Sequence, residues 1–230
     1  MIIRAQNISK VYNLNTEAEF FGIRDVSLEI NKGELIAIVG PSGAGKTTLF
    51  NILGTLDTPT FGQIEIKNKN ILSMDANEKS KLRNKVIGFI FQQFRLIPTL
   101  SALDNALLPL LVSEEGVDSP RKEKVIHLFE TYGLKNQLTK YPSQLSGGEQ
   151  QRVAIIRALV NDPDIILADE PTGSLDSKMS EYVFDTLQQI HKNNGKTVIY
   201  ITHNLNLVEK ANRVIKIEDG RVISDETCLC

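Results

Sequence analysis

The chain has 230 residues, 41% of them hydrophobic and 23% charged, which is typical of a globular protein with a sizeable core. Its formal net charge of -2 provides no overall basic field, so we expect no nucleic-acid partner. No apolar stretch fits a signal peptide or approaches the roughly 20 residues that span a bilayer. We therefore expect a cytoplasmic chain that reaches a membrane only through a partner.

The two cysteines, Cys228 and Cys230, lie at the extreme C-terminus. This placement excludes a secreted domain built on disulfides. The pair fits a frayed tail, a metal contact or an exposed thiol, and the sequence does not decide between these roles.

The first half of the chain reads mainly as strands. Apolar and polar residues alternate near the N-terminus, whereas later apolar runs are nearly continuous, as in buried parallel strands. A glycine loop follows the third strand and leads into a helix. We expect strands at 1–12, 23–30, 33–40, 62–68 and 86–91, and helices at 46–56 and 76–85.

The second half begins with a change to helical patterns, from Gln92 to about Leu159. Strands then return, and a hairpin around Asp219-Gly220 closes the chain. Such alternation predicts an α/β domain with a mostly parallel sheet, into which the helical stretch is inserted. We expect helices at 121–134, 148–159 and 180–194, strands at 164–170, 196–203 and 213–223, and connections containing Pro98, Pro109, Pro120 and Pro142.

A loop with phosphate-binding spacing follows the apolar run at 33–40. The residues GPSGAGKT at 40–47 match G-x-x-x-x-G-K-[ST], with a predicted strand before them and a helix after them. Glycines let backbone amides wrap phosphate oxygens, and the helix start adds positive potential. We expect Lys46 to bridge the β- and γ-phosphates and Thr47 to bind Mg²⁺. The candidate phosphate-binding residues are Gly40, Ser42, Gly43, Ala44, Gly45, Lys46, Thr47 and Thr48.

Two carboxylates end the apolar run at 164–170. At the carboxyl end of a parallel strand, Asp169 and Glu170 would lie where ligands bind in open α/β sheets. Asp169 fits a contact to a metal or to its bound water. Glu170 fits a catalytic base that polarises water for attack on a γ-phosphate.

Two other polar residues follow apolar strands. Gln92 comes after the strand at 86–91, and we expect it to contact Mg²⁺ or the attacking water. His203 ends the strand at 196–203 and is expected to hydrogen-bond the γ-phosphate. Tyr12, at the end of the first strand, is a candidate for stacking on adenine, because an aromatic face tolerates any purine.

A second helix start with anion-binding character occurs in the residues LSGGEQQR at 145–152. Ser146 is a suitable N-cap and the glycines after it leave the backbone amides bare. One small protein would then have two phosphate-binding loops.

Taken together, these motifs resemble the ATP-binding subunit of an ABC transporter, and the resemblance covers essentially the whole chain. They occur in the order of the family: Tyr12, the phosphate loop, Gln92, LSGGEQQR as the signature, the strand with Asp169 and Glu170, SLD at 174–176, and His203. The segments 52–64, 89–105 and 168–176 are similar to the lipoprotein-releasing and macrolide-exporting branch, and QFRLIPTL after Gln92 favours macrolide or peptide efflux. Gly22 stands where alanine is frequent in the family.

The resemblance implies a P-loop NTPase (RecA-like) fold. Its mostly parallel sheet core would carry an N-terminal antiparallel β part and an inserted helical subdomain. A single domain over 1–230 would comprise a nucleotide-binding core, 1–91 and 160–230, and a helical subdomain, 92–159.

The resemblance also accounts for the second anion site. In this family two copies pair head to tail, and the signature residues Ser146, Gly147, Gly148 and Glu149 of one copy close on the ATP held by the other. ATP with Mg²⁺ would be hydrolysed to drive an integral membrane permease, contacted through the helical subdomain and the segment at Gln92.

Three alternatives to transport differ in how well they fit the sequence. A soluble ABC ATPase of DNA repair or translation usually has coiled coils, zinc modules or tandem units that do not fit into this length. A small-molecule kinase would leave LSGGEQQR without a role. A mechanical signalling ATPase that moves no substrate stays open, since the permease would handle any substrate.

Overall fold

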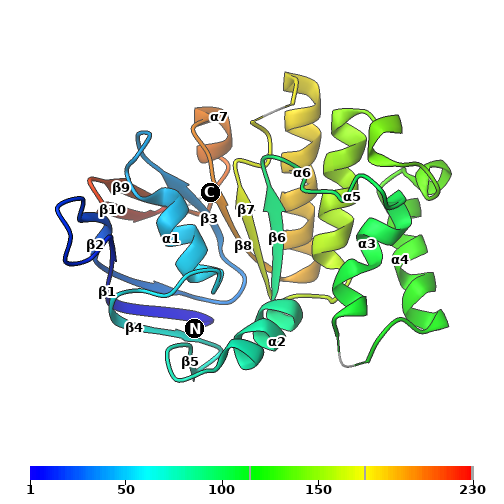
Figure 1. Cartoon of the computed structure of the whole chain (residues 1–230). Coiled ribbons are helices and arrows are strands. Elements are labelled where there is room, and N and C mark those ends of the chain that lie inside the picture. Colours follow the sequence, from blue (N-terminus) through cyan, green and yellow to red (C-terminus); the bar gives the residue numbers. More distant parts are fainter. Residues whose placement is uncertain (114, 174, 229–230) are drawn as a thin grey trace. The chain divides into compact units, whose positions relative to one another are not determined.

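The computed structural model describes residues 1–113, 115–173 and 175–228, so Ser174 of the SLD motif and Cys230 lie outside the described residues. The chain forms two compact units (Figure 1). One comprises Met1–Ser80 and Ile190–Cys230, and the other comprises Lys81–Gln189. Among the described residues, no helix has the length and apolar character needed to cross a bilayer.

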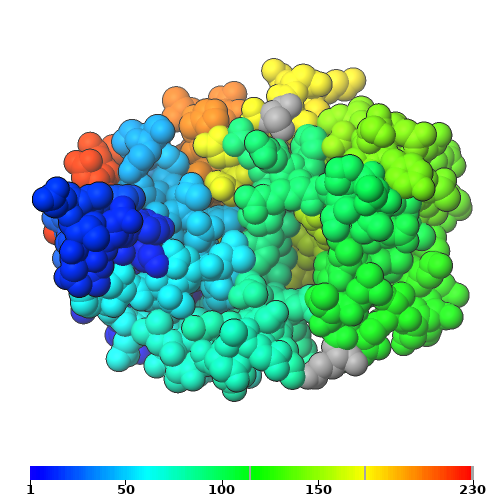
Figure 2. Space-filling view, viewed as in Figure 1, coloured from blue at the N-terminus to red at the C-terminus, as the bar shows by residue number. Residues whose placement is uncertain are grey.

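The first unit contains an antiparallel sheet in the order β2-β1-β4-β5. Its strands are β1 (Ile3–Tyr12), β2 (Phe20–Ile30), β4 (Phe61–Ile66) and β5 (Lys69–Asn70). Ile3 pairs with both Ile30 and Ile66, and all three side chains are fully buried, so one face of the sheet packs inward. The connection 13–19 between β1 and β2 is exposed along its length, at the blue end of the space-filling view (Figure 2).

The same unit contains the strands that lead to the phosphate loop. These are β3 (Leu35–Val39), β8 (Thr197–Ile201), β9 (Arg213–Glu218) and β10 (Arg221–Thr227), in the order β10-β9-β3-β8. β3 is parallel to β8 and β9, while β9 and β10 form the expected hairpin, with positive φ at Asp219 and Gly220. The helices α1 (Lys46–Leu53) and α7 (Leu205–Val208) follow β3 and β8.

The second unit contains a parallel pair of strands and most of the helices. The strands are β6 (Ile87–Phe91) and β7 (Ile165–Asp169). Between them lie α3 (Ala102–Leu111), α4 (Ser119–Thr131), the 3₁₀ turns Lys135–Gln137 and Pro142–Gln144, and α5 (Gly147–Leu159). α2 (Ala76–Val86), whose first residues belong to the first unit, precedes β6, and α6 (Ser177–Asn194), whose last residues belong to the first unit, follows β7. The sequence predicts a helical subdomain over residues 92–159. The second unit is wider, since it also contains β6 and β7, and the boundaries of that subdomain stay a prediction.

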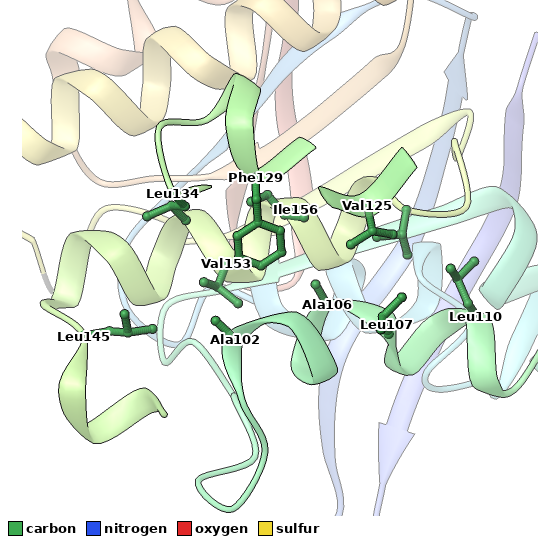
Figure 3. Packing of buried hydrophobic residues seen from close by; sticks show 11 residues of the cluster. Ala102, Ala106, Leu107, Leu110, Val125, Phe129, Leu134, Leu145, Val153 and Ile156 are labelled. Atoms are coloured by element: carbon green, nitrogen blue, oxygen red, sulfur yellow. The ribbon is translucent and has the colours of Figure 1, made fainter. Parts of the chain in front are cut away.

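An apolar core holds α3, α4 and α5 together (Figure 3). Phe129 of α4 packs in one cluster with Ala106 of α3 and with Val153 and Ile156 of α5, and all four side chains are fully buried. Burying a large apolar side chain contributes about 1.5–3 kcal/mol, so these contacts fix α5 and with it the start of the signature motif.

Two prolines were expected in connections but lie in helices. Pro109 is inside α3, and Pro120 is in the first turn of α4. The first turn of a helix tolerates proline because its amide would have no intrahelical partner there. At Pro109 the buried neighbours Ala106, Leu107 and Leu110 outweigh the lost backbone hydrogen bond.

Candidate nucleotide site

The phosphate loop joins the buried strand β3 to α1. A Cβ built on Gly40 would lie 2.1 Å from the carbonyl oxygen of Ile217, so only glycine fits at this position. Gly45 is the N-cap of α1 with a φ of 101°, and no side chain of the described residues caps this helix start. The first amides of α1 are therefore available to the oxygens of an anion.

The ammonium group of Lys46 lies against this loop. Its Nζ donates to the carbonyl oxygens of Gly40, at 2.9 Å, and Pro41, at 2.7 Å. The positive charge is thus in place before any phosphate arrives, which reduces the reorganisation that binding requires.

His203 lies at the same sheet edge as the phosphate loop. β3 and β8 are parallel, and Ile38 pairs with Ile201, so both strands end at one edge. From there β3 continues to Gly40, and β8 continues to His203, whose side chain is exposed. This placement suits the expected contact with a γ-phosphate, which stays a prediction.

Tyr12 is the last residue of β1 and is half-buried. A Cβ built on Gly22 would lie 2.6 Å from Cε2 of Tyr12 and 2.9 Å from Oγ1 of Thr48. The Tyr12 ring and the Thr48 side chain therefore both lie close to Gly22 of β2, which places Tyr12 beside the first turn of α1.

In the second unit, the parallel pairing of β6 and β7 brings three candidate residues to one edge. Phe91 pairs with Asp169, so Gln92 and Glu170 follow directly from neighbouring strands. A Cβ on Gly173 would lie 2.6 Å from Nε2 of Gln92 and 3.3 Å from Oε2 of Glu170. The amide and the carboxylate thus converge on the turn after β7.

Glu170 has a left-handed backbone conformation, with φ at 44°. Its carbonyl accepts a hydrogen bond from the amide of Gly173 at 3.0 Å, which closes the turn. Such a conformation costs a non-glycine residue of order 1 kcal/mol and concentrates at functional sites. The turn holds the carboxylate at the end of β7 instead of letting the strand continue.

The signature motif starts α5 with a capping box. Oγ of Ser146 accepts from the amide of Glu149 at 3.3 Å, and Oε2 of Glu149 accepts from the amide of Ser146 at 2.8 Å. Nε2 of Gln137 donates to the other carboxylate oxygen at 2.9 Å. These hydrogen bonds, first the one from the Ser146 amide, hold the pKa of Glu149 below its usual range. Ser146 and Gly147 stay exposed, so the helix start is accessible from outside.

Two residues of α5 connect the signature helix to the other candidate residues, and no sequence pattern pointed to either. Nη1 and Nη2 of Arg157 donate to the carbonyl oxygens of Arg95, at 2.6 Å, and Phe94, at 2.8 Å, in the segment after Gln92. The buried amide of Gln151 donates to the carbonyl oxygen of Pro171, next to Glu170, at 2.7 Å. Burial and the neighbouring Arg95 lower the pKa of Arg157.

Replacing Arg157 with Gln should release the segment after Gln92. The variant loses two charge-assisted hydrogen bonds to backbone carbonyls, each contributing about 1.5–3 kcal/mol. We expect faster amide exchange at residues 93–97, measured by hydrogen-exchange mass spectrometry. Arg157→Lys keeps the charge without the forked geometry and should give an intermediate rate. Wild-type exchange in Arg157→Gln would show that the contact does not restrain this segment.

The candidate residues therefore fall into two groups. Tyr12, the phosphate loop and His203 belong to the first unit, and Gln92, Asp169, Glu170 and the signature residues belong to the second. The model of the family described as ABC transporter matches residues 23–173, which include the phosphate loop, the signature motif and both carboxylates. The chain belongs to the ABC transporter family.

Relatives of full length support this membership. MJ0796, an ABC transporter ATP-binding protein of Methanocaldococcus jannaschii, is 43% identical over 228 residues, or 98% of this chain and 97% of the relative. The dimeric post-hydrolysis structure of MJ0796 bound to ADP and Pi matches with a TM-score of 0.91 and 40% identity over 100% of both chains. This match confirms the expected α/β P-loop fold.

The expected branch is confirmed by a relative named for export. The macrolide export ATP-binding/permease protein MacB of Syntrophobacter fumaroxidans is 43% identical over 227 residues. The match covers 98% of this chain but only 32% of MacB. This ABC transporter subunit thus corresponds to about a third of that protein, and it is an ATP-binding protein with ATPase activity.

Proposed function

We propose that two copies of this chain pair head to tail around two ATP molecules and drive an integral membrane partner of the export type. The observation that carries this proposal is the presence of two accessible anion-binding helix starts, at the phosphate loop and at Ser146. One copy needs only one of them to hold its own phosphates. The dimeric structure of MJ0796 and the name of MacB support the pairing and the export role.

Within each ATP site, the proposed roles follow from chemistry and placement. The amides of the phosphate loop and Lys46 bind the β- and γ-phosphates, and Glu170 accepts the proton of the attacking water. Gln92, beside Glu170 at Gly173, orients that water, and His203 hydrogen-bonds the γ-phosphate. Tyr12 stacks on the base.

The residues proposed for Mg²⁺ are Thr47, Gln92 and Asp169. A hydroxyl, an amide carbonyl and a carboxylate form an all-oxygen donor set, which is what Mg²⁺ prefers in proteins. When bound, the ion would neutralise charge on the β- and γ-phosphates. The pairing of Phe91 with Asp169 supports this assignment, because Gln92 then follows β6 at the sheet edge where Asp169 ends β7.

The membrane partner is proposed to bind the helical residues of 92–159 and the segment after Gln92, holding the chain at the cytoplasmic face. The connection from Arg157 to Phe94 and Arg95 supports this assignment, because it joins that segment to the signature helix. A signalling role without a moved substrate would use the same surface. Identifying what the co-purified partner binds distinguishes the two.

Complementation between two inactive variants tests the head-to-tail pairing. In a dimer of one Lys46→Ala chain and one Ser146→Arg chain, one composite site carries both lesions and the other is intact. We expect ATP to shift this mixture toward dimer in size-exclusion chromatography, whereas neither variant shifts alone. Glu170→Gln in both chains prevents hydrolysis from reopening the dimer.

The comparison must be made over a range of protein concentrations, because one intact site should hold a dimer more weakly than two. The matched control is Glu170→Gln without the other changes. If the mixture stays monomeric where this control is fully dimeric, Ser146 does not act on the ATP of the partner copy.

A further inference from the structure

A second aromatic ring accompanies Tyr12 at the end of the β1–β2 hairpin. The strand register pairs Tyr12 with Phe20, and the two rings stack with centroids 5.1 Å apart and planes 26° apart. Phe20 is 54% exposed, although large apolar side chains favour burial. Because the rings stack, Phe20 lies over one face of the Tyr12 ring, and its own outer side is open to solvent.

The Tyr12 ring is held in place from several directions. Its hydroxyl donates a hydrogen bond to Oδ2 of Asp57 at 3.4 Å, and Nζ of Lys10 donates one to Oδ1 of the same carboxylate at 2.5 Å. Nζ of Lys10 also lies 5.3 Å from the centre of the ring. A ring fixed in this way loses little conformational freedom when a ligand stacks on it.

Gly22 sets how close the Tyr12 ring comes to the phosphate loop. Any Cβ at Gly22 would clash with the Tyr12 ring and with Thr48 in the first turn of α1. Without that side chain, the ring lies directly beside the helix whose start receives the phosphates. Tyr12 and the phosphate loop thus lie in one unit, with Thr48 of α1 beside the ring.

We propose that Phe20 is a positioning residue for base binding: stacked on one face of the Tyr12 ring, it holds that ring so that the ATP base stacks on the other face. The inference rests on the proposed function of the phosphate loop. Stacking on an aromatic side chain contributes about 1–3 kcal/mol per base, and part of that contribution is lost when the ring that receives the base is no longer held in place. The other role open to Phe20 is a cross-strand pair that stabilises the hairpin alone.

The test compares ATP with tripolyphosphate, which presents phosphates but no base. Isothermal titration of the Phe20→Ala variant should show a dissociation constant for ATP raised about 5- to 20-fold, the lower part of the range for a lost stacking partner. The constant for tripolyphosphate should stay at the wild-type value. Phe20→Tyr should restore ATP binding, whereas Phe20→Leu, which keeps apolar bulk without a ring, should not.

Phe61→Ala is the matched control, because Phe61 is 57% exposed on β4 of the same sheet. It should bind both ligands as the wild type does, and thermal unfolding confirms that each variant is folded. Wild-type or tighter ATP binding by Phe20→Ala overturns the inference, as does an equal loss for ATP and tripolyphosphate. Failure of the wild-type chain to bind ATP would instead overturn the proposed function.

Discussion

Glu170→Gln is expected to bind ATP as the wild type does and to hydrolyse it at least about 100-fold more slowly. The lower limit is the usual effect of removing a general base. Glutamine keeps the size of the side chain and its place beside Gln92 at Gly173, but it cannot accept a proton from water. Single-turnover hydrolysis and equilibrium ATP binding, measured on the same preparation, separate the chemical step from affinity.

Glu181→Gln provides the control for this substitution, because it removes an exposed carboxylate of α6. Its single-turnover rate should equal that of the wild type. A wild-type rate in Glu170→Gln would exclude Glu170 as the base and leave the left-handed turn at the end of β7 without a catalytic explanation.

Lys46→Ala is expected to lose ATP affinity by at least about 100-fold. The ammonium is held over the phosphate loop by the carbonyls of Gly40 and Pro41, so its removal takes away a charge that is already positioned. Charge-assisted hydrogen bonds contribute about 1.5–3 kcal/mol each, and contacts to two phosphates account for the expected loss. Isothermal titration with ATP gives the measurement.

Tripolyphosphate adds a second criterion for Lys46→Ala. Since Lys46 acts on phosphates, affinity for this ligand should fall as far as affinity for ATP, in contrast with Phe20→Ala. Lys32→Ala, which removes an exposed lysine before β3, should bind both ligands normally. An unchanged ATP affinity in Lys46→Ala would mean that the phosphate loop is not the nucleotide site.

The sequence predicted the elements around the site well, because apolar runs of strand length end in polar residues at each candidate position. Strand, loop and helix around Lys46 lie as expected, and Asp169 ends β7. Pattern alone did not specify which strands pair. The register that sets Phe91 opposite Asp169, and so brings Gln92 toward Glu170, depends on tertiary contacts far apart in the chain.

Residues whose roles depend on hydrogen bonds between elements far apart in the chain are even harder to predict from the sequence. The spacing of Ser146 and Glu149 fits a capping box, but Gln137, the second partner of Glu149, comes from a separate turn. Arg157 reads as one more polar position of an amphipathic helix. Its role is visible only where its guanidinium meets the carbonyls of Phe94 and Arg95.

The contacts of Arg157 have a consequence for recombining this chain with its relatives. A chimera whose junction falls between Arg95 and Arg157 takes the carbonyls from one parent and the guanidinium from the other. Even where both parents have arginine, a small difference in the path of the backbone would leave a half-buried cation without its acceptors. Exchanged fragments should therefore begin before Phe94 and end after Arg157, so that the segment following Gln92 and the signature helix are inherited as one piece.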